Sequence, residues 1–343
     1  MKINTNNAKK KEKEEVKFKQ NITSNPFFIV GCGRSGTTLL RAILNNHPEV
    51  GIPLESLFII DYLQSKQPIK ILKHHLTKEY ELKEWGVPIS IEKLKDCNNS
   101  FELIDRLHFL YINQQDKVIW GQKTPRFVRY GHLLKQSFPR AKFIHLIRDP
   151  RAVVSSLCES QVHQSSIYHG AMRWKYDIQA GLSLEQKTGK DLLRLHYEDL
   201  VNDTLSAIKK VCLFLDIKFS PTMLDYYLQT PSEYSSYYKK IHSKLAEPIT
   251  ESSLDKWRLK LSLKEIRLIE FIAEKEMVEV NYKKETTIKD RPNSFYMLFS
   301  KLSRYMRIPK QLYHYQKHRN GYLRCVLLRK LKLRTLGLLP INR

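Results

Sequence analysis

An apolar run followed by a glycine-rich turn constrains the fold of this chain most. Residues 27–30 (FFIV) have the composition of a buried strand, residues 31–36 (GCGRSG) allow a tight turn, and residues 37–40 (TTLL) begin a helical pattern. Glycine lets the backbone approach an anion, and a helix N-terminus presents N–H groups to it. A strand, a glycine loop and a helix in this order form a phosphate-binding loop. The run therefore predicts an α/β domain that holds a phosphate here.

This loop departs from the ATPase and GTPase pattern at one position. In G-x-x-x-x-G-K-[ST], Thr37 stands where those proteins have lysine, and Arg34 is the only cation in the turn. The loop consequently lacks the ammonium group that contacts the γ-phosphate of a nucleoside triphosphate. The pattern favours a different phosphorylated donor. An ATP-dependent, kinase-like transferase with an atypical phosphate loop is the alternative.

Strand and helix patterns alternate beyond the loop. Further strand patterns cover residues 117–121, 141–147 and 191–196, and a long amphipathic helix pattern covers 165–187. Strands that alternate with helices indicate a parallel sheet covered on both faces. We therefore expect an α/β fold, a P-loop-NTPase-like three-layer sandwich with a central parallel sheet.

The run G-x-x-R-S-G-T-T-L-L resembles the 5′-phosphosulfate loop of sulfotransferases that use 3′-phosphoadenosine 5′-phosphosulfate (PAPS). The resemblance extends over roughly residues 27–260 and is greatest to the branch that contains tyrosylprotein sulfotransferases and many bacterial sulfotransferases. It implies that five loop residues surround the 5′-phosphate and the departing bridge oxygen. These are Arg34, Ser35, Gly36, Thr37 and Thr38.

A second motif follows the strand pattern 141–147. Arg148 stands at the carboxyl end of that strand, where parallel sheets bind ligands, and Ser156 follows about two turns into the next helix. The pattern R-D-P-R-x-x-x-x-S resembles the 3′-phosphate site of the family, which implies that Arg148 and Ser156 hold that phosphate. A local ion pair of Asp149 with Arg148 or with Arg151 at the helix start is the alternative. Some relatives carry another arginine where this chain has Ser160, so we expect a weaker grip or a substitute cation.

Sulfuryl transfer requires a base for the acceptor hydroxyl, and a positioned carboxylate can take its proton. The resemblance to the tyrosylprotein branch aligns Glu55, in the segment L-E-S, with this base. Glu49 and His47 are the rival candidates. A surface role for either glutamate, and a helix-end cap for the histidine, are the alternatives.

Lys123, in G-Q-K-T-P, follows the strand pattern 117–121. The family has a lysine here that stabilises charge on the transferring sulfuryl group, as a fixed cation does for developing negative charge. A solvated loop lysine is the alternative. The predicted catalytic residues are thus Glu55, Lys123 and Arg34, and Arg126 is a weaker candidate for the acceptor pocket.

Two further positions follow from the resemblance. Tyr197, at the end of the strand pattern 191–196, is expected near the adenosine, and Lys256 is expected to contact the 3′-phosphate. Ser243 is an open candidate for the same phosphate. The alternative is that Trp257 anchors the core and Lys256 merely extends along its surface to water.

The charge distribution divides the chain into three predicted parts. Of the net charge of +24, residues 1–20 carry +4 and residues 283–343 carry +14. We expect a disordered basic N-terminus at 1–24, a sulfotransferase domain at 25–282 and a basic helical C-terminal extension at 283–343. The extension could pack on the core with its basic face in solvent, or bind an anionic membrane surface or an acidic substrate. Nucleic acid is disfavoured as a partner.

The sequence shows no secretory signal, no run of about 18 apolar residues and no metal-binding spacing. Animal tyrosylprotein sulfotransferases work in the Golgi behind a membrane anchor, and this chain lacks one. We therefore expect a cytoplasmic protein with reduced thiols and no metal. The cysteines, odd in number and without a C-x-x-C pair, are Cys32, Cys97, Cys158, Cys212 and Cys325.

The resulting prediction is a PAPS-dependent sulfotransferase that releases 3′,5′-ADP after in-line displacement with a glutamate base. Its acceptor is a hydroxyl group of a peptide tyrosine, a carbohydrate, a lipid or a small alcohol, among which the sequence does not choose. It does not determine the oligomeric state either. Besides the kinase-like alternative, a non-catalytic protein that binds membranes or nucleic acid through the basic extension remains open.

Overall fold

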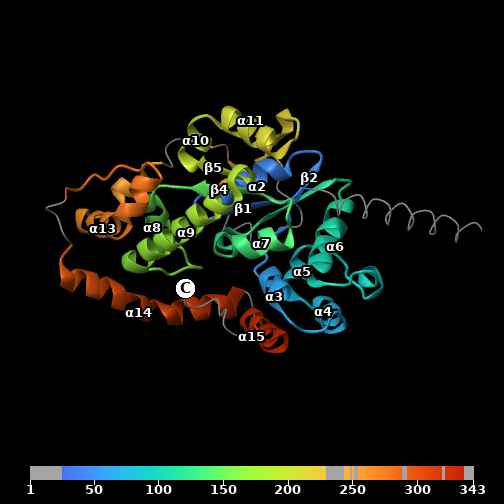
Figure 1. The fold of residues 1–343 in the computed structure, drawn as a ribbon. Coiled ribbons are helices and arrows are strands. Elements are labelled where there is room, and N and C mark those ends of the chain that lie inside the picture. Colours follow the sequence, from blue (N-terminus) through green and yellow to red (C-terminus); the bar gives the residue numbers. More distant parts are fainter. Residues whose placement is uncertain are drawn as a thin grey trace, which may run out of the picture.

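The computed structural model describes residues 25–228, 243–247, 249–250, 254–287, 292–318 and 321–335. Within them lies a parallel five-stranded sheet with the strand order β2-β3-β1-β4-β5 (Figure 1). The strands are β1 (Phe27–Gly31), β2 (Val50–Gly51), β3 (Ile119–Lys123), β4 (Lys142–Ile147) and β5 (Leu192–His196).

The central strand β1 is apolar on both sides because both faces of the sheet are covered. Phe28 and Val30 belong to one buried cluster, and Phe27 and Ile29 belong to another. The second cluster includes residues of α2 (Thr37–Asn45) and α11 (Thr204–Leu215). The first includes residues of α6 (Ser100–Asn113), α7 (Gly131–Ser137) and α9 (Ile167–Thr188). The three-layer α/β fold is therefore confirmed.

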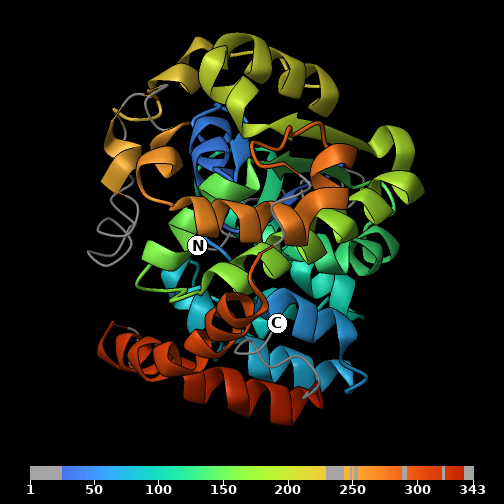
Figure 2. The same cartoon turned by 90° about the vertical axis from the view of Figure 1, so that its left-hand side faces the viewer.

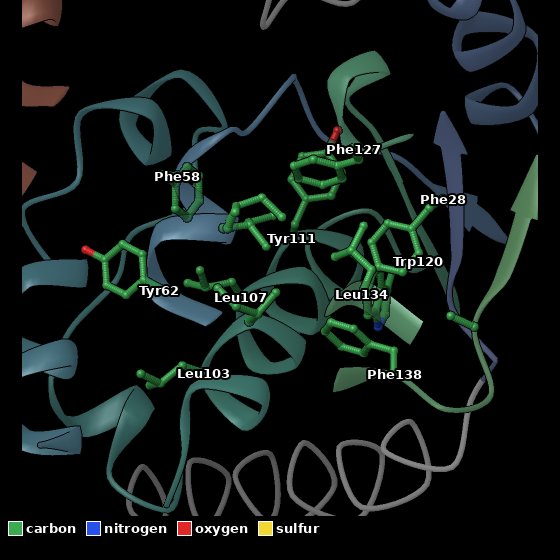
Figure 3. Packing of buried hydrophobic residues seen from close by; sticks show 14 of the residues in the cluster. Phe28, Phe58, Tyr62, Leu103, Leu107, Tyr111, Trp120, Phe127, Leu134 and Phe138 are labelled. Atoms are coloured by element: carbon green, nitrogen blue, oxygen red, sulfur yellow. The ribbon is translucent and has the colours of Figure 1, made fainter. Parts of the chain in front are cut away.

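The segment before β3 forms a helical layer beside the edge of the sheet. Its helices are α3 (Phe58–Gln64), α4 (Ile69–Leu76), α5 (Tyr80–Glu84) and α6, with the short 3₁₀ helix η1 (Glu92–Leu94). Their aromatic side chains join those of the sheet in one core (Figure 3). His108 of α6 stacks on Trp120 of β3 with ring centroids 4.1 Å apart. This packing holds α6 against β3, the next strand along the chain.

The remaining helices follow β4 and β5. They are α8 (Pro150–Glu159), α10 (Tyr197–Asn202), α13 (Leu263–Glu279), α14 (Ser294–His318) and α15 (Tyr322–Leu333). Short 3₁₀ helices are η2 (Pro125–Tyr130), η3 (Gly189–Asp191), η4 (Pro221–Asp225), η5 (Ser243–Ala246) and η7 (Lys256–Leu259). None of the described helices is both long and apolar enough to cross a lipid bilayer.

The C-terminal extension is helical, as predicted, and it packs on the body of the protein. Helix α14 contacts α9, and α15 contacts α3 (Figure 2). Arg329 of α15 forms buried ion pairs with the carboxylates of Asp61, Glu79 and Glu81. Part of the basic charge of the extension is therefore neutralised inside the protein.

Element boundaries differ from the prediction by one or two residues in several places, and two of the differences concern the candidate site. Strand β3 begins at Ile119 and ends at Lys123, because pairing with β1 extends to Ile29↔Lys123 although these last residues are polar. Tyr197 begins helix α10 instead of ending a strand. The predicted disordered N-terminus, 1–24, lies outside the described residues.

Candidate active site

The glycine loop joins β1 to α2 as predicted, and its backbone requires glycine at two places. A Cβ atom at Gly31 would lie 2.3 Å from the carbonyl oxygen of Leu146 on β4, so a side chain does not fit there. Gly36 has a φ of 88° and precedes the first turn of α2, which no side chain caps. Arg34 also adopts a left-handed conformation, with a φ of 77°. The loop thus leaves the N-terminus of α2 available to an anion.

Ser35 supplies a second sign of a ligand site in this loop. Its side chain is fully buried, and its Oγ atom has no hydrogen-bond partner among the described residues. Buried hydroxyl groups without a partner are rare in folded proteins because they lose their hydrogen bonds to water. A bound oxyanion in the loop would supply the missing partner.

Four of the predicted nucleotide-binding residues converge beside the loop. The Nε atom of Arg34 donates to Ser156 Oγ of α8 at 3.0 Å. The Nη1 atom of Arg148, which follows β4, donates to the carbonyl oxygen of Arg34 at 3.2 Å. The Arg148 guanidinium lies 4.2 Å from the ring centroid of Tyr197. Burial lowers the pKa of Arg34, and the positive charge of Arg148 lowers it further. Two neighbouring cations of this kind form a site that favours an anion.

A second group joins the loop to the predicted base. Lys123 is fully buried at the end of β3, and its Nζ atom donates to Thr38 Oγ1 at 3.2 Å. The same atom forms an ion pair with Glu55, whose side chain is 47% exposed. Burial lowers the pKa of Lys123, and the neighbouring Glu55 carboxylate opposes this shift. A fixed cation therefore stands between the phosphate loop and a carboxylate that solvent can reach.

The backbone around Glu55 is held by three residues that the sequence did not single out. Arg41, buried on α2, donates through Nε to two carbonyl oxygens of the segment 52–56, each at 3.0 Å. Gln122 of β3 donates to the Leu54 carbonyl of that segment at 3.2 Å, and the Oγ1 atom of Thr124 accepts the backbone N–H of Ser56 at 3.0 Å. The sequence signal was an arginine within the apolar first helix. These bonds fix the backbone from which the Glu55 side chain projects and leave its carboxylate oxygens unused.

The rival bases do not belong to this group. Glu49 is exposed, and its backbone carbonyl accepts the N–H groups of residues 118 and 119. His47 lies within hydrogen-bonding distance of the Lys218 carbonyl oxygen, 2.8 Å from Nε2, and its Nδ1 accepts the Glu49 N–H at 3.1 Å. Both imidazole nitrogens thus contact backbone groups outside α2, and neither of these contacts involves Glu55, Lys123 or the loop.

Lys256 is exposed at the start of η7, and no hydrogen bond or ion pair among the described residues joins it to the loop. Its neighbour Trp257 is buried against the guanidinium of Arg151, at 4.4 Å. Ser243 begins η5, and its surroundings up to residue 242 lie outside the described residues. The roles of Lys256 and Ser243 stay predictions.

A group of arginines next to the loop was not predicted from the sequence; we call Arg173, Arg126 and Arg34 the cationic wall. A Cβ atom at Gly33 would lie 2.7 Å from Nη2 of Arg173, which projects from α9. The Nη1 atom of Arg173 lies 3.2 Å from Nδ1 of His163. Burial, followed by the charges of Arg173, Arg34 and Arg126, lowers the pKa of His163 well below its usual value. Arg126, predicted for the acceptor pocket, is thus close enough to contribute to this positive region.

Among the described residues, no group of three or more His, Cys, Asp or Glu side chains is placed to hold a metal ion. The site is instead built from arginine, lysine, hydroxyl and backbone N–H donors around one carboxylate. This donor set suits a phosphorylated or sulfated ligand.

Comparisons with known proteins agree with this arrangement. A model of the sulfotransferase family matches residues 26–221, so the chain belongs to the sulfotransferase family, a family of transferase enzymes. The predicted family and enzyme class are therefore confirmed.

Two curated relatives are protein-tyrosine sulfotransferases. The protein-tyrosine sulfotransferase of Drosophila melanogaster is 28% identical over 67% of this chain and 46% of its own length. Protein-tyrosine sulfotransferase A of Caenorhabditis elegans is 28% identical over 69% of this chain and 62% of its own length. The chain thus spans about half to three fifths of the length of these relatives.

Among solved structures, the sulfotransferase domain from the curacin biosynthetic pathway has the same fold. Its TM-score is 0.56 at 18% identity, over 76% of this chain and 98% of that domain.

The prediction of a cytoplasmic location is wrong. It depended on the lack of an anchor-like run in this sequence, and the matching relatives include protein-tyrosine sulfotransferases, which are Golgi membrane enzymes.

Proposed function

We propose that this protein transfers a sulfuryl group from PAPS to a hydroxyl acceptor, with Glu55 as the general base. The observation that carries the proposal is the connection from Thr38 through the buried Lys123 to Glu55. It joins a phosphate-binding loop to a carboxylate that is held in place and partly open to solvent. Membership of the sulfotransferase family supports the reaction class.

The residues present fit the two ends of PAPS. The uncapped N-terminus of α2, the unpartnered hydroxyl of Ser35 and the buried guanidinium of Arg34 suit the 5′-phosphosulfate. Arg148 and Ser156, which both contact Arg34, suit the 3′-phosphate, and Tyr197 suits the adenosine. A planar guanidinium recognises phosphate oxygens better than an ammonium group does. By the family resemblance, Lys256 adds a contact to the 3′-phosphate.

PAPS supplies the sulfuryl group, and the chain supplies the base and the positive charge. Glu55 takes the proton of the acceptor hydroxyl, whose oxygen forms the new S–O bond while the S–O bond to the 5′-phosphate breaks and 3′,5′-ADP leaves. Lys123 and Arg34 stabilise the negative charge that develops on the sulfuryl and bridging oxygens. Because Lys123 is buried, its position is fixed before the reaction begins.

The test measures transfer of radiolabelled sulfate from PAPS to a panel of acceptors. A peptide that contains tyrosine comes first because the matched relatives are named protein-tyrosine sulfotransferases. A carbohydrate, a lipid headgroup and a small alcohol complete the panel. Tight magnesium-dependent binding of ATP, with no binding of PAPS, would instead support the kinase-like alternative.

The base assignment has its own control. We expect Glu55→Gln to lower turnover by about 10²-fold or more, since a positioned base contributes at least that factor. Its affinity for 3′,5′-ADP, measured by calorimetry, should stay within error of the wild type. Glu49→Gln, an exposed glutamate on the same stretch of chain, should leave both quantities unchanged. Equal losses of turnover in the two variants would refute the role of Glu55.

A further inference from the structure

Helix α14 presents an apolar stripe to solvent. Its members recur every three or four residues, and each exposes more than half of its surface. We call this set the outer stripe: Phe295, Leu298, Phe299, Leu302, Tyr305 and Met306. An exposed apolar surface of this extent on a soluble protein marks an interaction site.

Polar side chains on the other face of α14 attach the helix to the protein. Arg304 donates to the carbonyl oxygen of Gln164 at 2.8 Å, and Arg307 donates to that of Ser165 at 2.7 Å. Gln311 donates to a carbonyl of the same loop, that of Val162, at 2.8 Å. The outer stripe takes no part in these bonds, so its side chains are available to a partner.

Positive charge surrounds the outer stripe. At about 100° per residue, Lys301 and Lys310 fall on opposite sides of it. The sequence from 292 to 335 contains eleven lysine and arginine residues and no aspartate or glutamate, and of these Arg329 and Lys330 are held in buried ion pairs. In both views α14 and α15 form the lower edge of the molecule (Figures 1 and 2). Helix α15 adds three exposed leucines there, which are Leu327, Leu328 and Leu331.

We propose that the outer stripe and its flanking lysines dock α14 on the surface of an anionic lipid bilayer, with the helix parallel to the membrane plane. A helix with Phe and Leu on one face and Lys and Arg beside them is typical of such an interface. A second copy of this chain would bring like charges together, since α14 and α15 contain no acidic residue. Nucleic acid would pair with the lysines and leave the apolar side chains in water.

This docking would place the active site near the membrane. The loop that α14 holds includes His163, which contacts Arg173 of the cationic wall. The inference does not depend on the proposed reaction, because it concerns the outward face of the helix alone.

The experiment is co-sedimentation of the full-length protein with vesicles. Vesicles of phosphatidylcholine are compared with vesicles of phosphatidylcholine and phosphatidylserine, at low and at high salt. We expect binding to the anionic vesicles only, weakened by salt. Leu302→Ser combined with Met306→Ser should lower the partition coefficient about tenfold or more through lost apolar burial. Lys301→Gln and Lys310→Gln should each lower it about fivefold, which corresponds to about 1 kcal/mol per charge.

Matched variants elsewhere serve as controls. Leu213→Ser removes an 82% exposed leucine from α11, and Lys264→Gln removes an exposed lysine from α13. Both should bind vesicles as the wild type does. The proposal is overturned if the wild type ignores anionic vesicles, or if the stripe variants bind as well as the controls. It is also overturned if sedimentation shows that the wild type is a dimer and that only the stripe variants are monomers. Binding of a DNA duplex without binding of vesicles would overturn it as well.

Discussion

Substitution of Gly36 by alanine tests how the glycine loop is coupled to the proposed 3′-phosphate site. The new Cβ atom would lie 2.2 Å from Cδ2 of Tyr197, far inside van der Waals contact, and the ring is buried. The ring must therefore move, which breaks its contact with the Arg148 guanidinium, 4.2 Å away. That contact is worth about 0.5–2 kcal/mol. The Arg148 guanidinium would also lose the orientation in which we propose that it binds the nucleotide. We expect the affinity for 3′,5′-ADP to fall about tenfold or more.

The variant also incurs a backbone cost that must be separated from this effect. Alanine at a φ of 88° loses roughly 1–2 kcal/mol of stability by itself. Gly86 is the matched control, because its φ is 68° and no other group lies within 4 Å of the place where a Cβ atom would stand. Gly86→Ala should lower the thermal midpoint and leave the calorimetric affinity for 3′,5′-ADP unchanged. Wild-type affinity in Gly36→Ala, or an equal loss in both variants, would show that this coupling does not exist.

Three further predictions concern the nucleotide site, the C-terminal extension and acid stability. Arg148→Ala should weaken binding of 3′,5′-ADP much more than that of 5′-AMP in calorimetry; equal losses would contradict its 3′-phosphate role. Arg329→Met should lower the free energy of unfolding by about 3–5 kcal/mol in urea titrations, because it leaves buried carboxylates such as Glu79 without their cation, whereas Arg324→Met on the exposed side should have little effect. Burial lowers the pKa of His145 to about 3, so its contribution to stability is complete above pH 6.5 and is lost as the pH falls toward 3. His145→Leu should reduce the slope of unfolding free energy against pH in that window by about 1.4 kcal/mol per unit, and an unchanged slope would show that the imidazole is not buried as a neutral group.

Features that depend on neighbouring residues were predictable from the sequence. The strand, the glycine turn and the first helix are contiguous, so their pattern predicts their structure. Asp149 is followed directly by Pro150, which is a local signal for a helix start, and its carboxylate accepts the Arg151 N–H at 2.8 Å at the beginning of α8.

Features that depend on distant partners were not predictable in the same way. The end of β3 is polar, and only its pairing with β1 makes Lys123 the last residue of a buried strand. Arg41 supports the Glu55 segment from α2, and Arg173 reaches the loop from α9. An arginine within the apolar pattern of α2 signals a buried polar contact, but nothing in the local pattern of either helix identifies the partner.

The sequence by itself determined the candidate phosphate loop, the family and the candidate base. Each of them can be identified from a short contiguous motif, without knowledge of distant contacts. Only the tertiary structure decided that Lys123 joins Glu55 to that loop, across 68 positions of the chain. It also decided which face of α14 turns inward. An apolar stripe is usually the buried face of a helix, yet here Arg304 and Arg307 attach the polar face to backbone carbonyls. The amphipathic pattern is the same either way, and the choice depends on the acceptors of a distant loop and on the apolar cluster against which Tyr296 and Met297 pack.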